Sequence, residues 1–482
     1  MFFGFRFILA FLIAVLLRSA DVSVATPNVL FIIADDLSNT LSCYGAEGVM
    51  TPHLDKLASR GRMFGRAYCQ ASLCNPSRTS ILTGRRPHQT RIWTNAPHFR
   101  GIYPRITTLP QHFKANGYHT VGIGKIFHNW GQSLQGDPQS WSEPETNHWA
   151  AHYHDWYLPG RPYQMHFDIK KGPAVQCEDV PDEAYIDGRT ANAAVNKLRE
   201  LKETPFFLAV GFWKPHLPYN APKKYWDLYD RDALPPVRYP GPVEEVPEIA
   251  YVNSKEARSY TDVPKEGPIS PEKKLELRHG YLAAISYLDA QVGKILDELE
   301  RLGLAENTIV VFLSDHGYHA GEHGQFGKWT NFEIGTRVPL IIAAPGMAEP
   351  GVPTNSIAEL VDLYPTLLDL ANMEPPGDRK KRAGVSLAPI IEDPDAEVKT
   401  YAVSQITRPL GAGPDYEVVG STVRDSQLRY NVWMDRKSGK VLAEELYDLS
   451  IDLLNAENRI DDAEYAKQRK QLQGALNGLL HQ

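Results

Sequence analysis

The sequence has few cysteines and no surplus of positive charge. Its 482 residues include only four cysteines, too few for the disulfide framework that stabilises small secreted domains. Lysines and arginines number 51 against 58 aspartates and glutamates, which gives a formal charge of −7. A protein that binds nucleic acid needs basic groups to neutralise phosphates. The charge balance therefore argues against a nucleic-acid partner.

Long hydrophobic runs are also missing. A helix needs about 20 apolar residues to span a bilayer, and the most pronounced run, Phe7–Leu17, stops at Arg18. A basic residue precedes this run, and small residues follow it, with Ser23 and Ala25 placed as at a cleavage site. The pattern predicts a secretory signal peptide over residues 1–25 rather than a membrane anchor. We expect export through the Sec pathway and no membrane segment after cleavage.

Acceptor sites for N-linked glycans are absent as well. The one similar triplet, Asn75-Pro76-Ser77, carries the proline that excludes glycosylation. A secreted chain of this length without a single acceptor is more typical of bacteria. The expected location is therefore the bacterial periplasm or the extracellular space.

The composition is that of a folded globular protein, with 43% hydrophobic and 23% charged residues. Continuous apolar, β-favouring runs indicate strands that are buried on both faces, as in a parallel sheet covered by helices. An apolar stripe at three- and four-residue steps over Pro271–Leu304 predicts a long core helix. The alternation predicts an α/β fold with a large mixed, mainly parallel sheet flanked by helices. The expected strands are Asn28–Ala34, Thr120–Gly124, Phe206–Gly211, Thr308–Leu313 and Val338–Ala343.

The texture of the sequence changes along the chain and suggests its domains. Residues 129–181 and 219–270 lack a clean period and read as long insertions over the sheet. After about residue 390, short strand-like pieces lead into a polar helix near the C-terminus. We expect a catalytic domain over residues 26–390 and a small α+β subdomain with an antiparallel sheet over residues 391–482.

Acidic residues follow two of the expected strands. Asp35 and Asp36 come directly after the first strand, and Asp315 and His316 follow the strand that ends at Leu313. Ligands in such folds sit beyond the carboxyl ends of the strands. A single Asp pair is often only a helix cap or a solvated turn, but two acidic clusters at buried strand ends favour a cation. Oxygen-rich ligands suit Ca²⁺ or Mg²⁺ better than zinc.

A cysteine lies at the start of a helix-like segment, Ser72–Arg85. Cys74 by itself could be an ordinary structural thiol. Pro76 or Ser77 could begin a helix that Gly84 ends. The positive end of that helix and Arg78 would then point at Cys74, a placement that activates nucleophiles and binds anions.

The run Cys-x-Pro-Ser-Arg from Cys74, followed by Leu-x-Thr-Gly-Arg from Leu82, resembles the signature of type I sulfatases in the alkaline phosphatase superfamily. The resemblance covers nearly the whole chain after the signal peptide and implies an alkaline phosphatase-like fold. It also implies that a maturase oxidises Cys74 to formylglycine (3-oxoalanine) before the chain folds.

The resemblance further implies one Ca²⁺ held by Asp35, Asp36, Asp315 and His316 together with the modified Cys74. Many members of the family have Asn in place of His316. This departure resembles the iduronate 2-sulfatases and their bacterial relatives. Two more stretches resemble that subgroup, Phe212–Pro218 with its Lys-Pro-His segment, and Gly321–Phe332, which carries Lys328. The subgroup resemblance leaves the exact sugar open, because Tyr318 stands where Trp is familiar in the mammalian iduronate enzyme.

The chemistry of a sulfate ester explains why these residue types are needed. Hydrated formylglycine would attack the sulfur, while Arg78, Lys125 and Lys328 would hold the sulfate oxygens. Either His216 or His128 would protonate the departing oxygen, with His216 preferred, and a second histidine would act as base.

Several neighbouring residues can also be interpreted as having no part in catalysis. His128 could be a plain loop histidine, and Lys214 could either touch substrate or be solvated. His319 and His323 could simply pack their loop. Pairing among the other cysteines cannot be assigned from their spacing.

The expected activity is hydrolysis of a sulfate ester on a sugar. The favoured substrate is the 2-O-sulfate of a uronic acid in glycosaminoglycan fragments. The long insertions favour a closed pocket and action at chain ends. Alternatives are sulfated algal polysaccharide, choline sulfate, and phosphonate or phosphate monoesters on the same scaffold. A glycan-binding protein with a dead site is a further alternative, but the complete set of motif residues argues against it.

Overall fold

The computed structural model describes residues 26–128, 132, 134–146, 154–168, 171–243, 245–410, 415–454 and 457–481. The expected signal peptide, residues 1–25, lies outside them. Within these ranges, no helix is both long enough and apolar enough to cross a membrane. The four cysteines are all free thiols.

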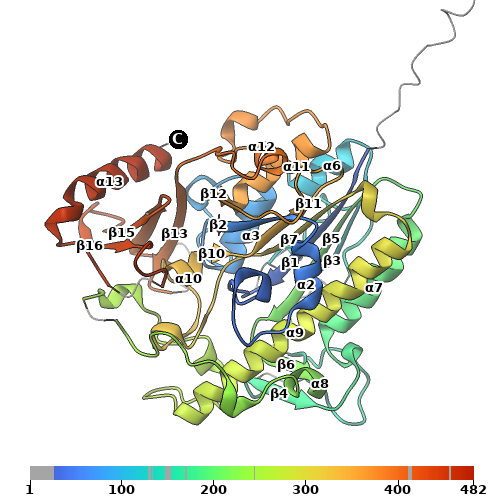
Figure 1. Ribbon diagram of the computed structural model, residues 1–482, viewed down its shortest axis with the longest axis horizontal. Coiled ribbons are helices and arrows are strands. Elements are labelled where there is room, and N and C mark those ends of the chain that lie inside the picture. Colours follow the sequence, from blue (N-terminus) through green and yellow to red (C-terminus); the bar gives the residue numbers. More distant parts are fainter. Residues whose placement is uncertain are drawn as a thin grey trace, which may run out of the picture.

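A mixed sheet forms the centre of the molecule (Figure 1). Its order among the described residues is β10-β2-β11-β7-β1-β5-β3, with β12 paired to β2. The pairs β7-β1, β1-β5 and β5-β3 are parallel, whereas β11 runs antiparallel to both β7 and β2. The predicted mixed, mainly parallel sheet is confirmed. Its strands are β1 (Asn28–Asp35), β2 (Arg62–Tyr68), β3 (His119–Gly124), β5 (Phe206–Pro215), β7 (Thr308–Ser314), β10 (Arg337–Val338), β11 (Leu340–Ala343) and β12 (Thr354–Glu359).

Helices cover both faces of the sheet, which explains why its central strands are apolar without alternation. On β1, Leu30 and Ile32 belong to the core on one face, and Phe31 and Ile33 belong to the core on the other. The first face packs against α2 (Pro52–Ala58), α7 (Ile186–Leu201) and α9 (Pro271–Arg301). The second face packs against α3 (Cys74–Thr83), α6 (Leu109–Ala115), α11 (Leu363–Leu370) and α12 (Ala388–Glu392).

A second sheet lies toward the C-terminus, at the left of Figure 1. Its four described strands are antiparallel in the order β13-β14-β15-β16, and a helix covers them. This matches the predicted antiparallel sheet with a C-terminal helix, while the boundary at residue 390 stays a prediction. The elements are β13 (Ala402–Arg408), β14 (Val418–Arg424), β15 (Leu428–Asp435), β16 (Val441–Asp448) and α13 (Ala466–Leu480).

Two small ribbons and four short helices complete the described elements that bear on the site. β4 pairs with β6 in parallel, and β8 pairs with β9 antiparallel in the segment before Lys328. These elements are β4 (Val175–Glu178), β6 (Tyr219–Pro222), β8 (His319–Ala320), β9 (Phe326–Gly327), α4 (Pro87–Thr90), α5 (Phe99–Ile102), α8 (Lys223–Trp226) and α10 (Glu333–Thr336).

Two predicted boundaries differ from the structure. Helix α3 begins at Cys74 and not at Pro76 or Ser77, because Leu73 is the extended residue before the helix and its carbonyl accepts from the Ser77 amide at 3.1 Å. The run predicted as one strand over 338–343 is divided into β10 and β11 at Pro339, which has no backbone N–H to donate to a neighbouring strand.

Candidate active site

The candidate site lies where β1 and β7 end side by side. The two strands are parallel, and Ala34 pairs with Ser314, so the residues that follow each strand emerge together. Asp36 has φ of +65°, an unusual value for a residue with a side chain, and its amide donates to Asp315 Oδ1 at 3.4 Å. This turn brings the two predicted acidic clusters together.

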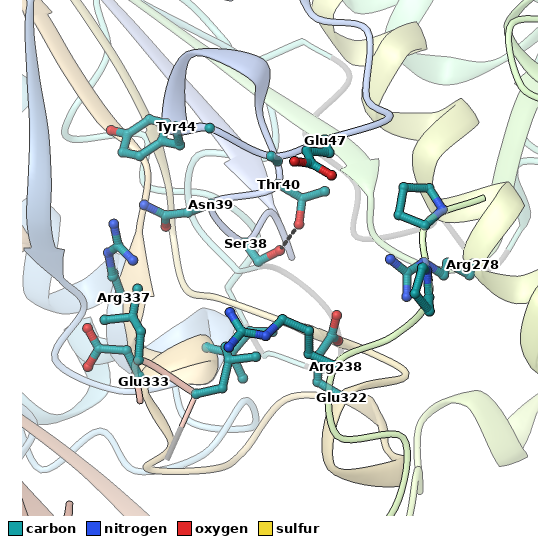
Figure 2. A pocket seen from close by; sticks show the side chains of 17 residues that line it. Ser38, Asn39, Thr40, Tyr44, Glu47, Arg238, Arg278, Glu322, Glu333 and Arg337 are labelled. Carbon is teal, nitrogen blue, oxygen red and sulfur yellow. Dashed lines mark hydrogen bonds between the residues drawn. The ribbon is translucent and has the colours of Figure 1, made fainter. Parts of the chain in front are cut away.

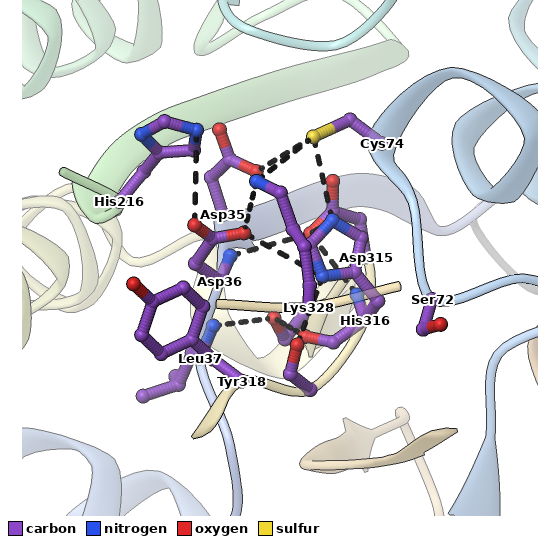
Figure 3. Close-up of polar contacts among 12 residues, drawn as sticks. Asp35, Asp36, Leu37, Ser72, Cys74, His216, Asp315, His316, Tyr318 and Lys328 are labelled. Carbon is purple, nitrogen blue, oxygen red and sulfur yellow. Dashed lines mark hydrogen bonds and ion pairs between the residues drawn. The ribbon is translucent and has the colours of Figure 1, made fainter. Parts of the chain in front are cut away.

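Cys74 points into this group from the first residue of α3 (Figure 3). Its Sγ lies 3.3 Å from His316 Nε2, 3.5 Å from Asp35 Oδ1 and 3.6 Å from Lys328 Nζ. The backbone amides at the start of a helix are not used within the helix, so this position favours negative charge. The helix start and Lys328 therefore favour an anionic ligand next to Cys74, whereas burial raises the pKa of the thiol itself.

Three cations surround the cysteine. Arg78 lies one helical turn after Cys74, on the same face of α3, and its Nε donates to Asp315 Oδ2 at 2.8 Å. Lys125, just beyond β3, donates to Asp35. Lys328 Nζ lies 2.7 Å from Asp36 Oδ1. All three predicted anion-binding side chains thus meet the acidic cluster.

The ion pairs decide the protonation of the two neighbouring aspartates. Burial disfavours a charged Asp35, but Lys125, His216 and Arg78 outweigh it and hold the pKa of Asp35 well below its ordinary value. For Asp36, burial dominates, and its pKa is raised. Adjacent carboxylates whose pKa values are pushed apart are frequent at functional sites.

His216 lies close to Asp36, on the loop after β5. Its Nε2 is 3.7 Å from Asp36 Oδ2 and 3.0 Å from Glu256 Oε1, while Nδ1 contacts the Leu217 carbonyl. Both ring nitrogens therefore face acceptors, to which a protonated ring nitrogen can donate. A histidine in this state can donate a proton toward the site.

His128 is buried in a different way. Neither ring nitrogen has a hydrogen-bond partner among the residues that the structure describes. Burial first, and the charge of Lys125 second, hold the pKa of His128 well below its ordinary value. A neutral imidazole with an unused nitrogen is suited to accept a proton rather than to donate one.

Four side chains could hold a metal ion. Ligand atoms of Asp35, Asp36, Cys74 and His316 all lie within 4.8 Å of one another. Within the described part of the chain, Asp36 Oδ2 is buried without a hydrogen-bond partner. A buried carboxylate oxygen that receives no hydrogen bond is well placed to bind a cation. The fifth predicted ligand, Asp315, is adjacent, but its carboxylate accepts from Arg78 and from the His316 amide.

Glu256 completes the site and was not predicted from the sequence. It comes from the long insertion over residues 219–270 and contacts both His216 and Lys328. No motif surrounds it, so the sequence offered no signal by which to find it. Its position follows only from the way that the insertion folds back over the strand ends.

Some neighbours that the sequence singled out lie outside this group. Lys214 is fully buried and donates to the Pro218 carbonyl at 2.7 Å, so it is not solvated. His319 Nε2 contacts Thr330 Oγ1 at 2.8 Å, and His323 packs on the Phe332 ring. Tyr318 is buried, and its hydroxyl accepts a hydrogen bond from the Tyr219 hydroxyl at 3.0 Å.

The site is closed to solvent in this conformation. Each of the predicted catalytic and metal-binding side chains is at most 5% exposed. A cavity of about 580 Å³ opens nearby, behind the loop Ser38–Glu47, and is lined in part by Arg238, Arg278 and Arg337 (Figure 2). None of the predicted site residues lines it.

Comparisons with known proteins identify relatives of this chain. The chain is 33% identical to the mouse and to the human iduronate 2-sulfatase, over 91% of this chain and 91% and 92% of those proteins. It is 30% identical to the choline-sulfatase of Rhizobium meliloti strain 1021, over 90% of this chain and 82% of that protein.

Solved structures share the fold. A structure in complex with its substrate, D-glucosamine-2-N,6-O-disulfate, has a TM-score of 0.75 at 24% identity and covers 94% of this chain and 97% of that chain. The phosphonate monoester hydrolase of Silicibacter pomeroyi has a TM-score of 0.74 at 23% identity, with 94% of each chain covered. The family description Sulfatase matches residues 27–373. The chain belongs to the Sulfatase family and is a sulfuric ester hydrolase.

Proposed function

We propose that this protein removes the 2-O-sulfate of a uronic acid from glycosaminoglycan or related polysaccharide fragments, with Cys74 acting as formylglycine. The observation that carries the proposal is the placement of Cys74. It begins α3, one turn before Arg78, and its Sγ lies within 3.6 Å of both His316 and Lys328. A group at this point faces cations on several sides, as the attack on an anionic ester requires.

The metal site is assigned to Asp35, Asp36, His316 and the Cys74 position, with Asp315 as a further ligand. The donor set fits a hard cation, because most of its groups are carboxylates and Asp36 Oδ2 makes no hydrogen bond among the described residues. We assign Ca²⁺, with Mg²⁺ as the alternative. When bound, the cation would lower the pKa of the hydrated formylglycine and offset the charge of the two aspartates.

The arginine and the two lysines bind the sulfate group. Arg78, Lys125 and Lys328 bring three positive charges into a buried space, where each interaction with an anion is stronger than in water. Arg78 is fixed by Asp315, and Lys328 by Asp36 and Glu256, so their positions are held before substrate arrives. Such fixed cations stabilise charge that develops as the sulfur–oxygen bond breaks.

Two histidines divide the proton transfers. His216 Nε2 carries the proton that goes to the departing sugar oxygen, because both of its nitrogens face acceptors. Among the described residues, neither nitrogen of His128 has a hydrogen-bond partner, and its depressed pKa keeps the ring neutral, so we assign it the role of base. A sugar alkoxide is a poor leaving group, and its protonation is the step that the substrate most depends on.

The substrate class is inferred from the relatives. The iduronate 2-sulfatases are similar over 91% of this chain, and His316 carries the resemblance to that subgroup noted in the sequence. The closed site favours a single chain-end sugar over an internal one. We place the enzyme in the bacterial periplasm or outside the cell, after maturation of Cys74 by a formylglycine-generating enzyme.

A panel of substrates tests this assignment. Protein produced with a maturase would be incubated with 2-O-sulfated uronic disaccharides, sulfated algal oligosaccharides, choline sulfate and a phosphonate monoester. Release of sulfate from the disaccharides, at a kcat/KM at least about tenfold above the others, is the expected result. A clear preference for choline sulfate or for the phosphonate would overturn the substrate assignment, and choline sulfate is the sharper rival since its hydrolase is 30% identical.

A further inference from the structure

We infer that Glu256 is a positioning residue for the proton donor of this reaction, an inference that rests on the proposed function. Its carboxylate is buried, and Oε1 lies 3.0 Å from His216 Nε2 and 3.3 Å from Lys328 Nζ. One carboxylate oxygen thus joins the proposed acid to one of the sulfate-binding lysines. In Figure 3, His216 and Lys328 approach the aspartates from opposite sides of the site.

The loop that carries Glu256 is itself held firmly against the segment that carries Lys328. Ser254 Oγ accepts from the Phe326 amide at 2.9 Å, and Gln325 Oε1 accepts from the Val252 amide at 2.7 Å. Asn253 and Ser254 both have positive φ, +48° and +53°. Two consecutive side-chain-bearing residues in this conformation cost energy, and such strain persists only where surrounding contacts enforce it. The insertion is therefore built to deliver Glu256 to one place.

Glu256 determines how the His216 ring is turned. Contacts at both nitrogens, Nδ1 to the Leu217 carbonyl and Nε2 to Glu256, fix the ring about its last rotatable bond. Without Glu256, Nε2 would lose this 3.0 Å contact, and its approach to Asp36 Oδ2 is longer, at 3.7 Å. A ring that is free to turn would present its Nε2 proton less well to the departing oxygen, which must take that proton over from its contact with Glu256, and proton transfer requires close alignment.

The expected signature depends on the leaving group. A sugar alkoxide needs a proton as it departs, whereas 4-nitrophenolate leaves readily without one. Loss of Glu256 should therefore slow hydrolysis of a sugar sulfate much more than hydrolysis of 4-nitrophenyl sulfate. A residue that only supports the fold would slow both esters alike.

The test compares Glu256→Ala with the matured wild-type enzyme on both esters. We expect kcat for the 2-O-sulfated uronic disaccharide to fall at least about tenfold, with kcat/KM for 4-nitrophenyl sulfate within about threefold of wild type. On the disaccharide alone, KM should stay within about threefold. Equal losses on the two esters, or a loss confined to KM, would overturn the inference.

Three further variants make the result specific. Glu256→Gln keeps the volume and one acceptor, so it should recover part of the lost rate, and it carries the test if the alanine variant fails to fold. Glu359→Gln is the matched control, because Glu359 is also a buried carboxylate between two cations, Arg86 and Lys399, and lies outside the site. It should leave the ratio of the two rates unchanged. His216→Ala must show the same leaving-group signature as Glu256→Ala. If it does not, the proposed acid is wrong, independently of Glu256.

Discussion

At the scale of single residues, the unmodified cysteine is poorly suited to catalysis. Cys74 is buried beside Asp35, and burial raises the pKa of its thiol strongly. A protonated thiol is a weak nucleophile, and only the thiolate reacts readily. The surroundings therefore suit the role of Cys74 as a precursor better than a role as a thiolate.

The first prediction concerns this cysteine. Cys74→Ala should reduce sulfate release at least about a thousandfold, because it removes the only group that we propose for covalent attack. Cys177→Ser, at an exposed free thiol, is the matched control and should retain full activity. Initial rates of sulfate release measure both. Activity of the alanine variant within tenfold of wild type would exclude covalent catalysis at this position.

The second prediction concerns the cation. Ca²⁺ at about 100 times its Kd should raise the free energy of unfolding of the wild type by about 2–3 kcal/mol, because it binds only the folded site. In Asp36→Asn the gain should be largely lost, since a charged carboxylate of the metal site becomes a neutral amide. Denaturant unfolding with and without Ca²⁺ gives the comparison. Asp168→Asn, at an exposed acid, should behave as wild type, and an unchanged Ca²⁺ effect in Asp36→Asn would contradict the assignment.

The site could be predicted from the sequence as far as its residues follow strands or belong to a motif. Asp35 and Asp315 lie at the carboxyl ends of two neighbouring parallel strands, so their proximity follows from the fold class. Glu256 could not be predicted, because a loop brings it to the site across a large distance in sequence. Physical rules for loop paths are too weak to place such a residue.

At the scale of secondary-structure elements, the end of β3 shows how closely the backbone strands pack. Gly124 has φ of +75°, and a Cβ there would lie 2.0 Å from the Gly211 carbonyl oxygen on β5. Lys125 is the next residue. The glycine therefore permits the close approach that turns the chain toward Asp35.

The third prediction follows from this contact. Gly124→Ala should lower the free energy of unfolding by at least about 2 kcal/mol more than Gly117→Ala, because backbone atoms cannot yield as side chains do. Gly117 is the matched control, with a similar φ of +89° but no atom within 4 Å of the added Cβ. Urea unfolding of the two variants measures the difference. Equal losses would mean that conformation alone, and not the contact, makes Gly124 necessary.

The elements themselves were predicted unevenly. The central strands β1, β5 and β7 are buried throughout and mostly apolar, so they were predicted, as was α9 with its regular stripe. Strand β2 mixes buried and half-buried positions without alternation, so neither strand pattern matches it. The antiparallel direction of β11 arises from chain connection and has no local signal.

At the scale of the whole molecule, the burial of one histidine near the site makes the folding stability depend on pH. His323 is buried, and burial lowers its pKa from 6.5 to about 4. The contribution of the buried His323 ring to folding stability is fully present above pH 6.5, where the ring is neutral in both the folded and the unfolded chain. Below pH 6.5 the unfolded chain takes up the proton first, so stability falls as the pH drops toward 4.

The fourth prediction uses this dependence. Between pH 7 and pH 4.5, the free energy of unfolding of the wild type should fall by about 2–3 kcal/mol through His323 alone. The fall in His323→Gln should be smaller by that amount. The difference between the two pH values is the readout, since the variant also changes packing on Phe332. His481→Gln, at an exposed histidine, should match wild type. Parallel losses in wild type and His323→Gln would contradict the role given to burial.

The central claim for the whole molecule is that a sulfatase fold presents Cys74 as a formylglycine to a sugar sulfate. Mass spectrometry of the Cys74 peptide, from protein purified with its maturase and assayed in the same sample, tests it most directly. We predict the mass of an aldehyde in place of the thiol, together with release of sulfate from a 2-O-sulfated uronic disaccharide. An intact thiol in a fully active sample would contradict the account.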